Sequence, residues 1–183
     1  TTENSIKAIG QFVRTMVSAN SKYDRWQRGE EQFTEQELFG YQIFNDENGD
    51  CFHCHGDLTT GSLFGAYGDL QYSNNGLDSV LIPNSGREGA SGDSNDRGKF
   101  KIPSLRNIEY SFPYMHDGRF TTLQDVLEHY NMGGNITYTI DPNMKKAGVG
   151  RNWSQQQKDA LLAFLRTLSD NTFISDTSFS DPW

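Results

Sequence analysis

The stretch "CFHCHG", residues 51–56, holds both cysteines of this 183-residue chain and two of its four histidines. Four kinds of site could use side chains at this spacing. A structural zinc site usually has four ligands, but the chain has no second cysteine pair, and His116 and His129 are thirteen residues apart. A thioredoxin-like redox pair should lie in a βαβ pattern, which the sequence does not show. A disulfide between the two cysteines would leave the role of His55 unexplained.

The fourth kind of site, a covalent c-type haem, uses three of these side chains. Cys51 and Cys54 would form two thioether bonds, because both vinyl groups lie on one edge of the porphyrin. His55 follows directly and can turn beneath the iron as the proximal ligand. His53 occupies a variable position of the motif, where we expect a spacer that faces solvent. We therefore favour one covalent haem.

The composition agrees with a chain that wraps a large apolar group. Only 34% of the residues are hydrophobic and the mean hydropathy is −0.71, which is little core material for this length. The net charge of −8 argues against a nucleic-acid partner, since such proteins present a basic face. No apolar run approaches the roughly 20 residues of a transmembrane helix, and the first ten residues do not form a signal peptide. The missing signal does not indicate a cytoplasmic protein.

Hydrophobic spacing predicts a mostly α fold and a single domain over residues 1–183, with few helices and long irregular loops. Asn20 and Ser21 should end the opening helix, and Leu38, Tyr41 and Phe44 should form the apolar face of the second. The four expected helices are an amphipathic one near 4–19, one capped by Thr34 with Glu37, one capped by Thr121 or Thr122 and stopped at 133–134, and one started by Ser154 with Gln157.

Two segments show no periodic pattern. Residues 56–100 are rich in Gly, Asn, Ser and Asp, and so long an irregular stretch is uncommon in a compact domain. We expect it to wrap the haem. The polar tail after residue 168 should lie along the surface.

The third helix offers candidates for the other side of the iron. Leu123, Val126, Leu127 and Tyr130 share one face, so Tyr130 should point inward toward the haem. Met132 lies roughly 160° around the same helix. The ordinary alternative for Tyr130 is a buried aromatic ring whose hydroxyl finds a common hydrogen-bond partner.

The stretch "KIPSLRNIEYSFPYMHDGRFTTLQDVLEHYN", residues 101–131, together with the upstream Cys-x-x-Cys-His, resembles the C-terminal haem domain of the bacterial dihaem cytochrome c peroxidase and MauG family. The opening and closing residues resemble that domain too, so the resemblance covers nearly the whole chain. It implies one haem c in a c-type cytochrome domain, whose partner, an N-terminal haem domain, is absent from this sequence.

The resemblance also implies a distal iron ligand on the third helix, commonly Met in the peroxidases and Tyr in MauG. Alignment through "SFPYMHDG" places Tyr130 at that position, with Met115 and Met132 as alternatives. MauG has a tryptophan two residues before the first cysteine, used to pass oxidising equivalents to its protein substrate. Gly49 stands there in this chain, which argues against a MauG-specific role.

Four further residues take roles from the resemblance. The backbone carbonyls of Ser111 and Pro113 match a calcium site between the two haem domains of the family. His116 matches a family histidine near the haem, with a structural histidine as the alternative. Arg106 would neutralise a haem propionate or form a structural salt bridge.

As a function, the resemblance implies a peroxidase-type oxidoreductase of the bacterial periplasm or cell envelope, because haem is attached covalently outside the cytoplasm. This domain would pass electrons or oxidising equivalents to a peroxide-reacting haem in the missing N-terminal domain. Hydrogen peroxide is the expected substrate, a small redox protein or another donor supplies electrons, and a second copy of the chain is a further candidate partner. The alternatives are a self-contained monohaem electron carrier and, less favoured, a domain with peroxidase activity of its own.

Overall fold

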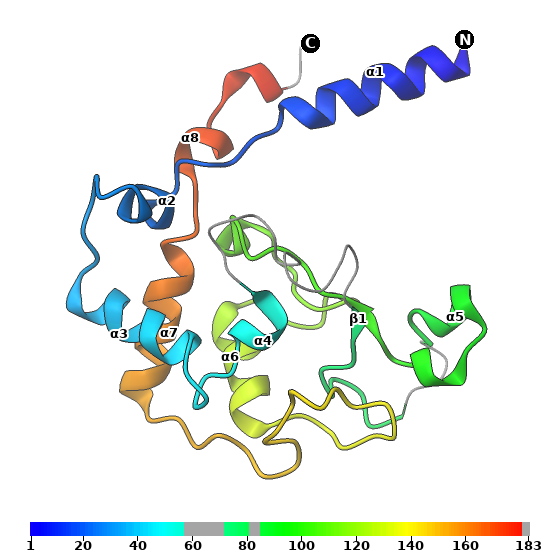
Figure 1. Ribbon diagram of the computed structural model, residues 1–183, viewed down its shortest axis with the longest axis vertical. Coiled ribbons are helices and arrows are strands. Elements are labelled where there is room, and N and C mark those ends of the chain that lie inside the picture. Colours follow the sequence, from blue (N-terminus) through cyan, green and yellow to red (C-terminus); the bar gives the residue numbers. More distant parts are fainter. Residues whose placement is uncertain (57–71, 81–84, 181–183) are drawn as a thin grey trace.

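The computed structural model describes residues 1–56, 72–80 and 85–180, and within them the chain is mostly helical, as predicted (Figure 1). A small antiparallel sheet joins β1 (Tyr72–Ser73) to β2 (Phe100–Lys101), with Tyr72 opposite Lys101. Every helix in these ranges is too short or too polar to span a bilayer. The helices are α1 (Thr2–Thr15), α2 (Lys22–Gln27), α3 (Glu35–Phe44), α4 (Phe52–His55), α5 (Glu88–Ser91), η1 (Ser94–Asp96), η2 (Ile108–Tyr110), α6 (Leu123–Met132), α7 (Gln155–Arg166), α8 (Asn171–Ile174) and η3 (Thr177–Phe179).

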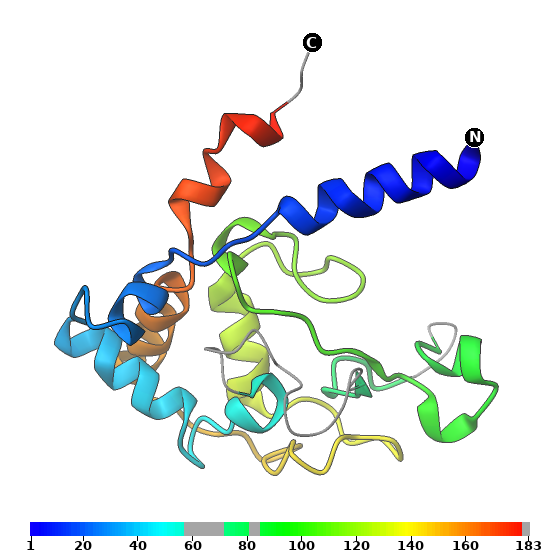
Figure 2. The same cartoon turned by 45° about the horizontal axis from the view of Figure 1, so that its top comes forward.

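The opening helix α1 has the amphipathic pattern that the sequence predicts, but it ends at Thr15 and buries none of its residues. It runs away from the rest of the chain in both views (Figures 1 and 2). Its apolar face is largely exposed, with exposed fractions between 39% and 68%, and Phe12 makes an edge-to-face contact with Phe179 of η3. The members of this face are Ile6, Ile9, Phe12, Val13, Met16 and Val17.

The second helix, α2, is a correction to the sequence analysis. Asn20 and Ser21 were expected only to end the first helix, yet Ser21 begins a new one. The Ser21 side chain accepts a hydrogen bond from the Asp24 amide, and the Asp24 carboxylate accepts one from the Ser21 amide at 2.9 Å. This is a capping box with Asp in place of the usual Glu or Gln.

The core forms where α3 packs on α7, and Gly40 sets how closely these helices approach. A β-carbon at Gly40 would overlap the backbone carbonyl of Ala160 on α7. This contact turns Ile43 and Phe44 into the core, whereas Leu38, expected on the apolar face, is 40% exposed. The buried core cluster contains Tyr23, Ile43, Phe44, Leu105, Leu127, Trp153, Ala160, Leu161, Phe164, Leu165 and Leu168.

The helices α6 and α7 begin where the sequence predicts. Thr122 caps α6, Gly133 ends it at φ 85°, and Ser154 caps α7 through a capping box with Gln157. α6 packs on α7, so the α3–α7 core also supports α6. The polar tail, which was expected only to lie along the surface, forms α8 and η3 after Asp170.

Candidate functional site

The cysteine motif forms one short helical turn, α4, directly after Cys51. The amides of Cys54 and His55 donate to the Cys51 carbonyl at 3.2 and 3.0 Å, and Gly56 ends the turn at φ 58°. Residues three apart on a helical turn share a face, so both thiols lie on one side, with His55 one position further. α4 lies beside α6 in both views, which brings the motif close to the helix that carries Tyr130 (Figures 1 and 2).

The alternatives to haem receive no support from the described residues. Both cysteines are free thiols. In residues 1–56, 72–80 and 85–180, the one group of three His, Cys, Asp or Glu ligands within metal-binding distance is Glu47, Asp50 and His53, which includes neither thiol. The sheet in these ranges has two antiparallel strands, unlike a thioredoxin βαβ unit.

Burial controls the protonation of the motif. It raises the pKa of Cys51 to about 12 and that of Cys54 to about 11, so both side chains are neutral thiols at neutral pH. Burial also lowers the pKa of His55 to about 4, which keeps the imidazole neutral, as an iron ligand must be.

The second ring nitrogen of His55 is the notable polar atom of the site. This nitrogen, Nδ1, is buried and makes no hydrogen bond of good geometry. Burial lowers the pKa of His55, and the Pro103 carbonyl acts in the opposite direction. A histidine that binds metal through one nitrogen commonly donates the other N–H to a backbone carbonyl. The Pro103 carbonyl, which acts on the His55 ring, is the candidate acceptor for that hydrogen.

His53 is not the purely solvent-facing spacer that was expected. Its side chain is 30% exposed, and Nδ1 pairs with the carboxylate of Asp50, whose own side chain is fully buried. Asp50 also lies 3.3 Å from Lys145 Nζ, which in turn contacts Glu47 at 2.6 Å. Because a lysine ammonium already sits among these carboxylates, this group is an ion-pair cluster that anchors the start of the motif.

On α6, Tyr130 points inward as the hydrophobic spacing predicts and packs against the core cluster. Burial raises the pKa of Tyr130 to about 12, and the Asn75 amide, which donates to the phenol oxygen at 3.2 Å, acts to lower it. The thiols of Cys51 and Cys54 also influence the pKa of this tyrosine, so the three side chains share one part of the molecule.

The two methionine alternatives differ in position. Met115 lies near Tyr130, because its sulfur accepts from the same Asn75 amide at 3.6 Å. Met132 is 66% exposed at the last position of α6, just before Gly133. Its exposure and its place away from the apolar face of α6 favour Met115 over it as the alternative ligand, and both stay predictions.

The remaining residues suggested by the resemblance have protein partners. Arg106 forms a bidentate salt bridge with Asp24, with both nitrogen–oxygen distances 2.8 Å, so the structural alternative is present; a contact with a propionate stays a prediction. The His116 ring stacks on Phe100 with centroids 3.8 Å apart. Ser111 and Pro113 are exposed and flank Phe112, and their part in calcium binding also stays a prediction.

The absence of a tryptophan before the motif has a steric cause. A β-carbon at Gly49 would overlap the backbone carbonyl of Ile43 at the end of α3. This turn therefore admits no larger residue at position 49 unless the backbone moves.

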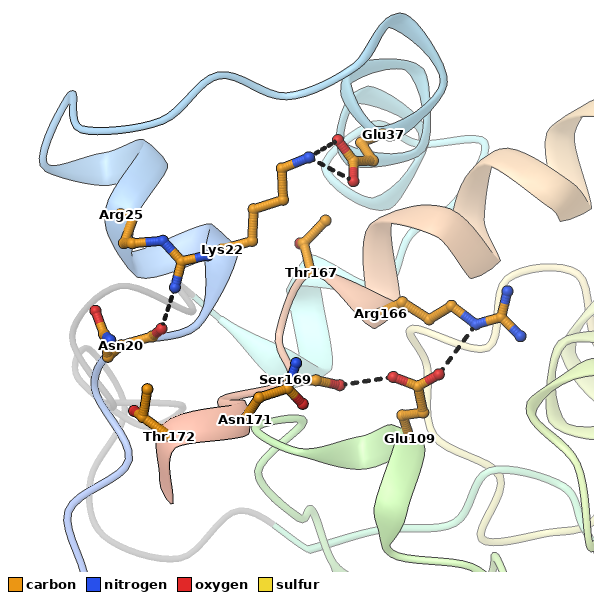
Figure 3. A pocket seen from close by; sticks show the side chains of 10 residues that line it. All are labelled: Asn20, Lys22, Arg25, Glu37, Glu109, Arg166, Thr167, Ser169, Asn171 and Thr172. Carbon is orange, nitrogen blue, oxygen red and sulfur yellow. Dashed lines mark hydrogen bonds and ion pairs between the residues drawn. The ribbon is translucent and has the colours of Figure 1, made fainter. Parts of the chain in front are cut away.

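A separate polar cavity of about 360 Å³ lies between α2, α3 and the end of α7 (Figure 3). Its charged groups pair with one another: Lys22 contacts the Glu37 carboxylate at 2.7 Å, and Arg166 contacts Glu109 at 3.3 Å. Its lining contains neither thiol, nor His55, nor Tyr130. It is a mixed-charge surface cavity rather than part of the site on α4.

Together these residues fit a c-type haem. Two neutral thiols share a face, a neutral histidine has a nitrogen without a hydrogen-bond partner, and a partly buried phenol lies nearby. Sequence analysis missed Asn75 and Pro103, because both act through contacts between distant segments. Asn75 lies in the aperiodic stretch, and a pattern search had no signal for it.

Comparisons with known proteins bear on the family of this chain. No family model matches the chain. It is 32% identical over 167 residues to a cytochrome c551 peroxidase from Nitrosomonas europaea, covering 88% of this chain and 43% of that protein. It is 33% identical over 202 residues to the methylamine utilization protein MauG of Paracoccus denitrificans, and the match covers 91% of this chain and 50% of that protein. A solved MauG-like protein associated with microbial copper homeostasis matches with a TM-score of 0.78 and 35% identity, over 91% of this chain and 53% of that one.

The chain spans about half the length of the curated relatives it matches, and it corresponds to their C-terminal part.

Proposed function

Since this chain is homologous to the C-terminal part of the cytochrome c peroxidases and MauG proteins, we propose that it is the C-terminal haem c domain of a dihaem peroxidase-type oxidoreductase. Cys51 and Cys54 would hold the haem, His55 would be its proximal ligand, and Tyr130 would be the distal ligand. The bound group supplies a one-electron iron couple. The observation that carries the proposal is the shared location of two free thiols, a partly buried neutral imidazole and a partly buried phenol.

The protein side chains prepare this site before any redox step. Burial keeps His55 unprotonated, and the Pro103 carbonyl can accept the hydrogen of Nδ1, which would fix the ring orientation and leave Nε2 for iron. A phenolate from Tyr130 is a hard anionic donor that favours ferric over ferrous iron. The domain is thus suited to hold an oxidised state.

We propose that its redox partner is a second, peroxide-reacting haem domain, since the relatives are about twice as long as this chain. Hydrogen peroxide is the proposed substrate, a small redox protein the electron donor, and the periplasm or cell envelope the location. The exposed apolar face of α1 supports association with another protein surface over the alternative of a self-contained carrier. Calcium at the Ser111 and Pro113 carbonyls belongs to the same proposal.

The test is expression with haem-maturation machinery, followed by intact mass and optical spectra with and without dithionite. We expect a mass increase of one haem and a reversible one-electron change in the spectrum. The double variant Cys51→Ser and Cys54→Ser should lose the covalent addition, whereas His53→Ala, which alters the variable position, should keep it. A wild-type chain that carries no haem after this treatment would overturn the proposal.

A further inference from the structure

Asn75 lies in a segment whose backbone is anchored on both sides. The side chain of Asn74 donates to two threonine hydroxyls of the loop 135–141, at 2.9 and 3.0 Å. On the other side, the Gly76 carbonyl accepts from the amide of Asn135 at 2.7 Å. These contacts fix the segment against the loop that follows α6. Asn75 is therefore held in place by its neighbours, independently of its own side chain.

The contacts of Asn75 itself lead to α6. Its carbonyl lies 3.0 Å from Nε2 of His129, and its side-chain nitrogen lies 3.2 Å from the hydroxyl oxygen of Tyr130, the next residue on the helix. The same nitrogen lies 3.6 Å from the sulfur of Met115. A primary amide has two hydrogens, so one nitrogen can donate to both acceptors at once.

The two acceptors are alternative iron ligands of opposite character. The phenol oxygen of Tyr130 is a hard donor and the thioether of Met115 is a soft one. Met115 has a left-handed backbone at φ 72°, which is uncommon for a side chain other than Gly, Asn or Asp. Such conformations persist where the surroundings hold them in place. The hydrogen bond from Asn75 is one of the contacts that hold this side chain.

We propose that Asn75 is a positioning residue that selects the sixth iron ligand. It holds the Tyr130 oxygen in the ligating position and keeps the Met115 sulfur beside it, where the sulfur replaces the oxygen when the amide is lost. This inference rests on the proposed haem function. An N–H donor stabilises an anionic oxygen more than a neutral sulfur, and the difference corresponds to about tenfold in the equilibrium between the two ligands.

The experiment uses the haem-loaded chain and reads the ligand, not the activity. Asn75→Leu should move the ratio of Tyr130-bound to Met115-bound ferric haem about tenfold toward methionine, seen as growth of the red charge-transfer band of Met-ligated ferric haem. The midpoint potential should rise by about 59 mV, the one-electron equivalent of that factor. The double variant Asn75→Leu and Met115→Leu should lack the new band. Met132→Leu is the matched control, since this exposed methionine should change neither spectrum nor potential.

The outcomes separate the two proposals. A wild-type chain without haem overturns the proposed function, and this inference with it. If both proteins carry haem, and Asn75→Leu has the same spectrum and midpoint potential as the wild type, this inference alone is overturned. Where Asn75→Leu does not fold, Asn75→Ser gives the same comparison, because the shorter hydroxyl side chain cannot reach either acceptor. A methionine band already dominant in the wild type would also overturn the selection of Tyr130.

Discussion

The carboxylate of Asp170 connects two parts of the chain that are far apart in sequence. It is 1% exposed and caps α8 by accepting from the amides of Thr172 and Phe173, each at 3.1 Å. Its other oxygen accepts from the Asn20 amide at 2.9 Å and the Ser18 hydroxyl at 3.2 Å. The linker between α1 and α2 and the start of α8 therefore depend on one charged acceptor.

The change Asp170→Asn replaces one accepting oxygen with an amide nitrogen, which cannot accept from the Asn20 amide. Burial alone would raise the pKa of Asp170, but the hydrogen bonds, led by that from Thr172, lower it to about 2 from an ordinary 3.8. A difference of about 1.8 pKa units corresponds to about 2 kcal/mol of folding free energy at neutral pH. Because the folded pKa is depressed, this stability is present above pH 3.8 and is lost as the pH falls toward 2.

The assay is urea unfolding of both proteins between pH 7 and pH 3. Asp170→Asn should be less stable by about 2 kcal/mol at pH 7. The difference should shrink below about pH 4, because the carboxylate of the unfolded wild-type chain then takes up a proton while the folded one stays ionised. Asp176→Asn is the matched control, an exposed cap of η3, and should have little effect. Equal stability at pH 7, or a deficit that does not change with pH, would refute the reasoning.

Three further changes test the packing around the site. Gly40→Ala should destabilise the chain by about 1–3 kcal/mol in urea unfolding, because α3 and α7 must separate to admit the methyl group. The control Gly10→Ala, on exposed α1 with nothing within 4 Å of the new β-carbon, should stabilise it by up to about 1 kcal/mol. Stability changes of the same sign in the two variants would contradict this. Arg106→Met should lower the free energy of unfolding by about 2 kcal/mol and raise the pKa of Asp24, because the carboxylate loses its cationic partner. NMR titration measures this pKa, and an unchanged value would refute the salt bridge. Gly49→Trp should greatly reduce the yield of folded, haem-loaded chain, and normal loading would show that the turn can open.

Local patterns predicted a large share of the helices. Thr34, Thr122 and Ser154 cap helices as expected, because a side-chain cap satisfies amides within three residues of itself. Ser21 was missed because its partner is Asp24, shorter than the usual Glu or Gln, and the preceding Asn20 suggested only an end. The sequence therefore predicts a helix start where Ser or Thr at the cap is followed three residues later by Glu or Gln.

Contacts between distant segments were not predictable in the same way. The face of α3 depends on Gly40 meeting α7, so the spacing of its own apolar residues placed Leu38 inside incorrectly. For the proposed site, spacing and resemblance predicted His55 from the motif and an inward-facing Tyr130 from a helical face, and Tyr130 does pack inward. Asn75 approaches Tyr130 across 55 residues of sequence, and no local rule relates them.

The two sides of the proposed iron site are carried by different helices, α4 and α6, and the core cluster packs against both. The ring centroids of Phe164 on α7 and Phe44 lie 5.3 Å apart, and those of Phe44 and His55 lie 6.4 Å apart. α7 also packs on α6, which carries Tyr130. Phe164→Leu, a change in a fully buried residue of the core, should therefore loosen the spacing between both ligands. We expect mixed ligation in the ferric spectrum and a lower urea midpoint. The exposed change Leu38→Ala on α3 should leave the spectrum unchanged. A single, wild-type ligation state in Phe164→Leu would mean that the two ligands are positioned by their own loops rather than by the α3–α7 core.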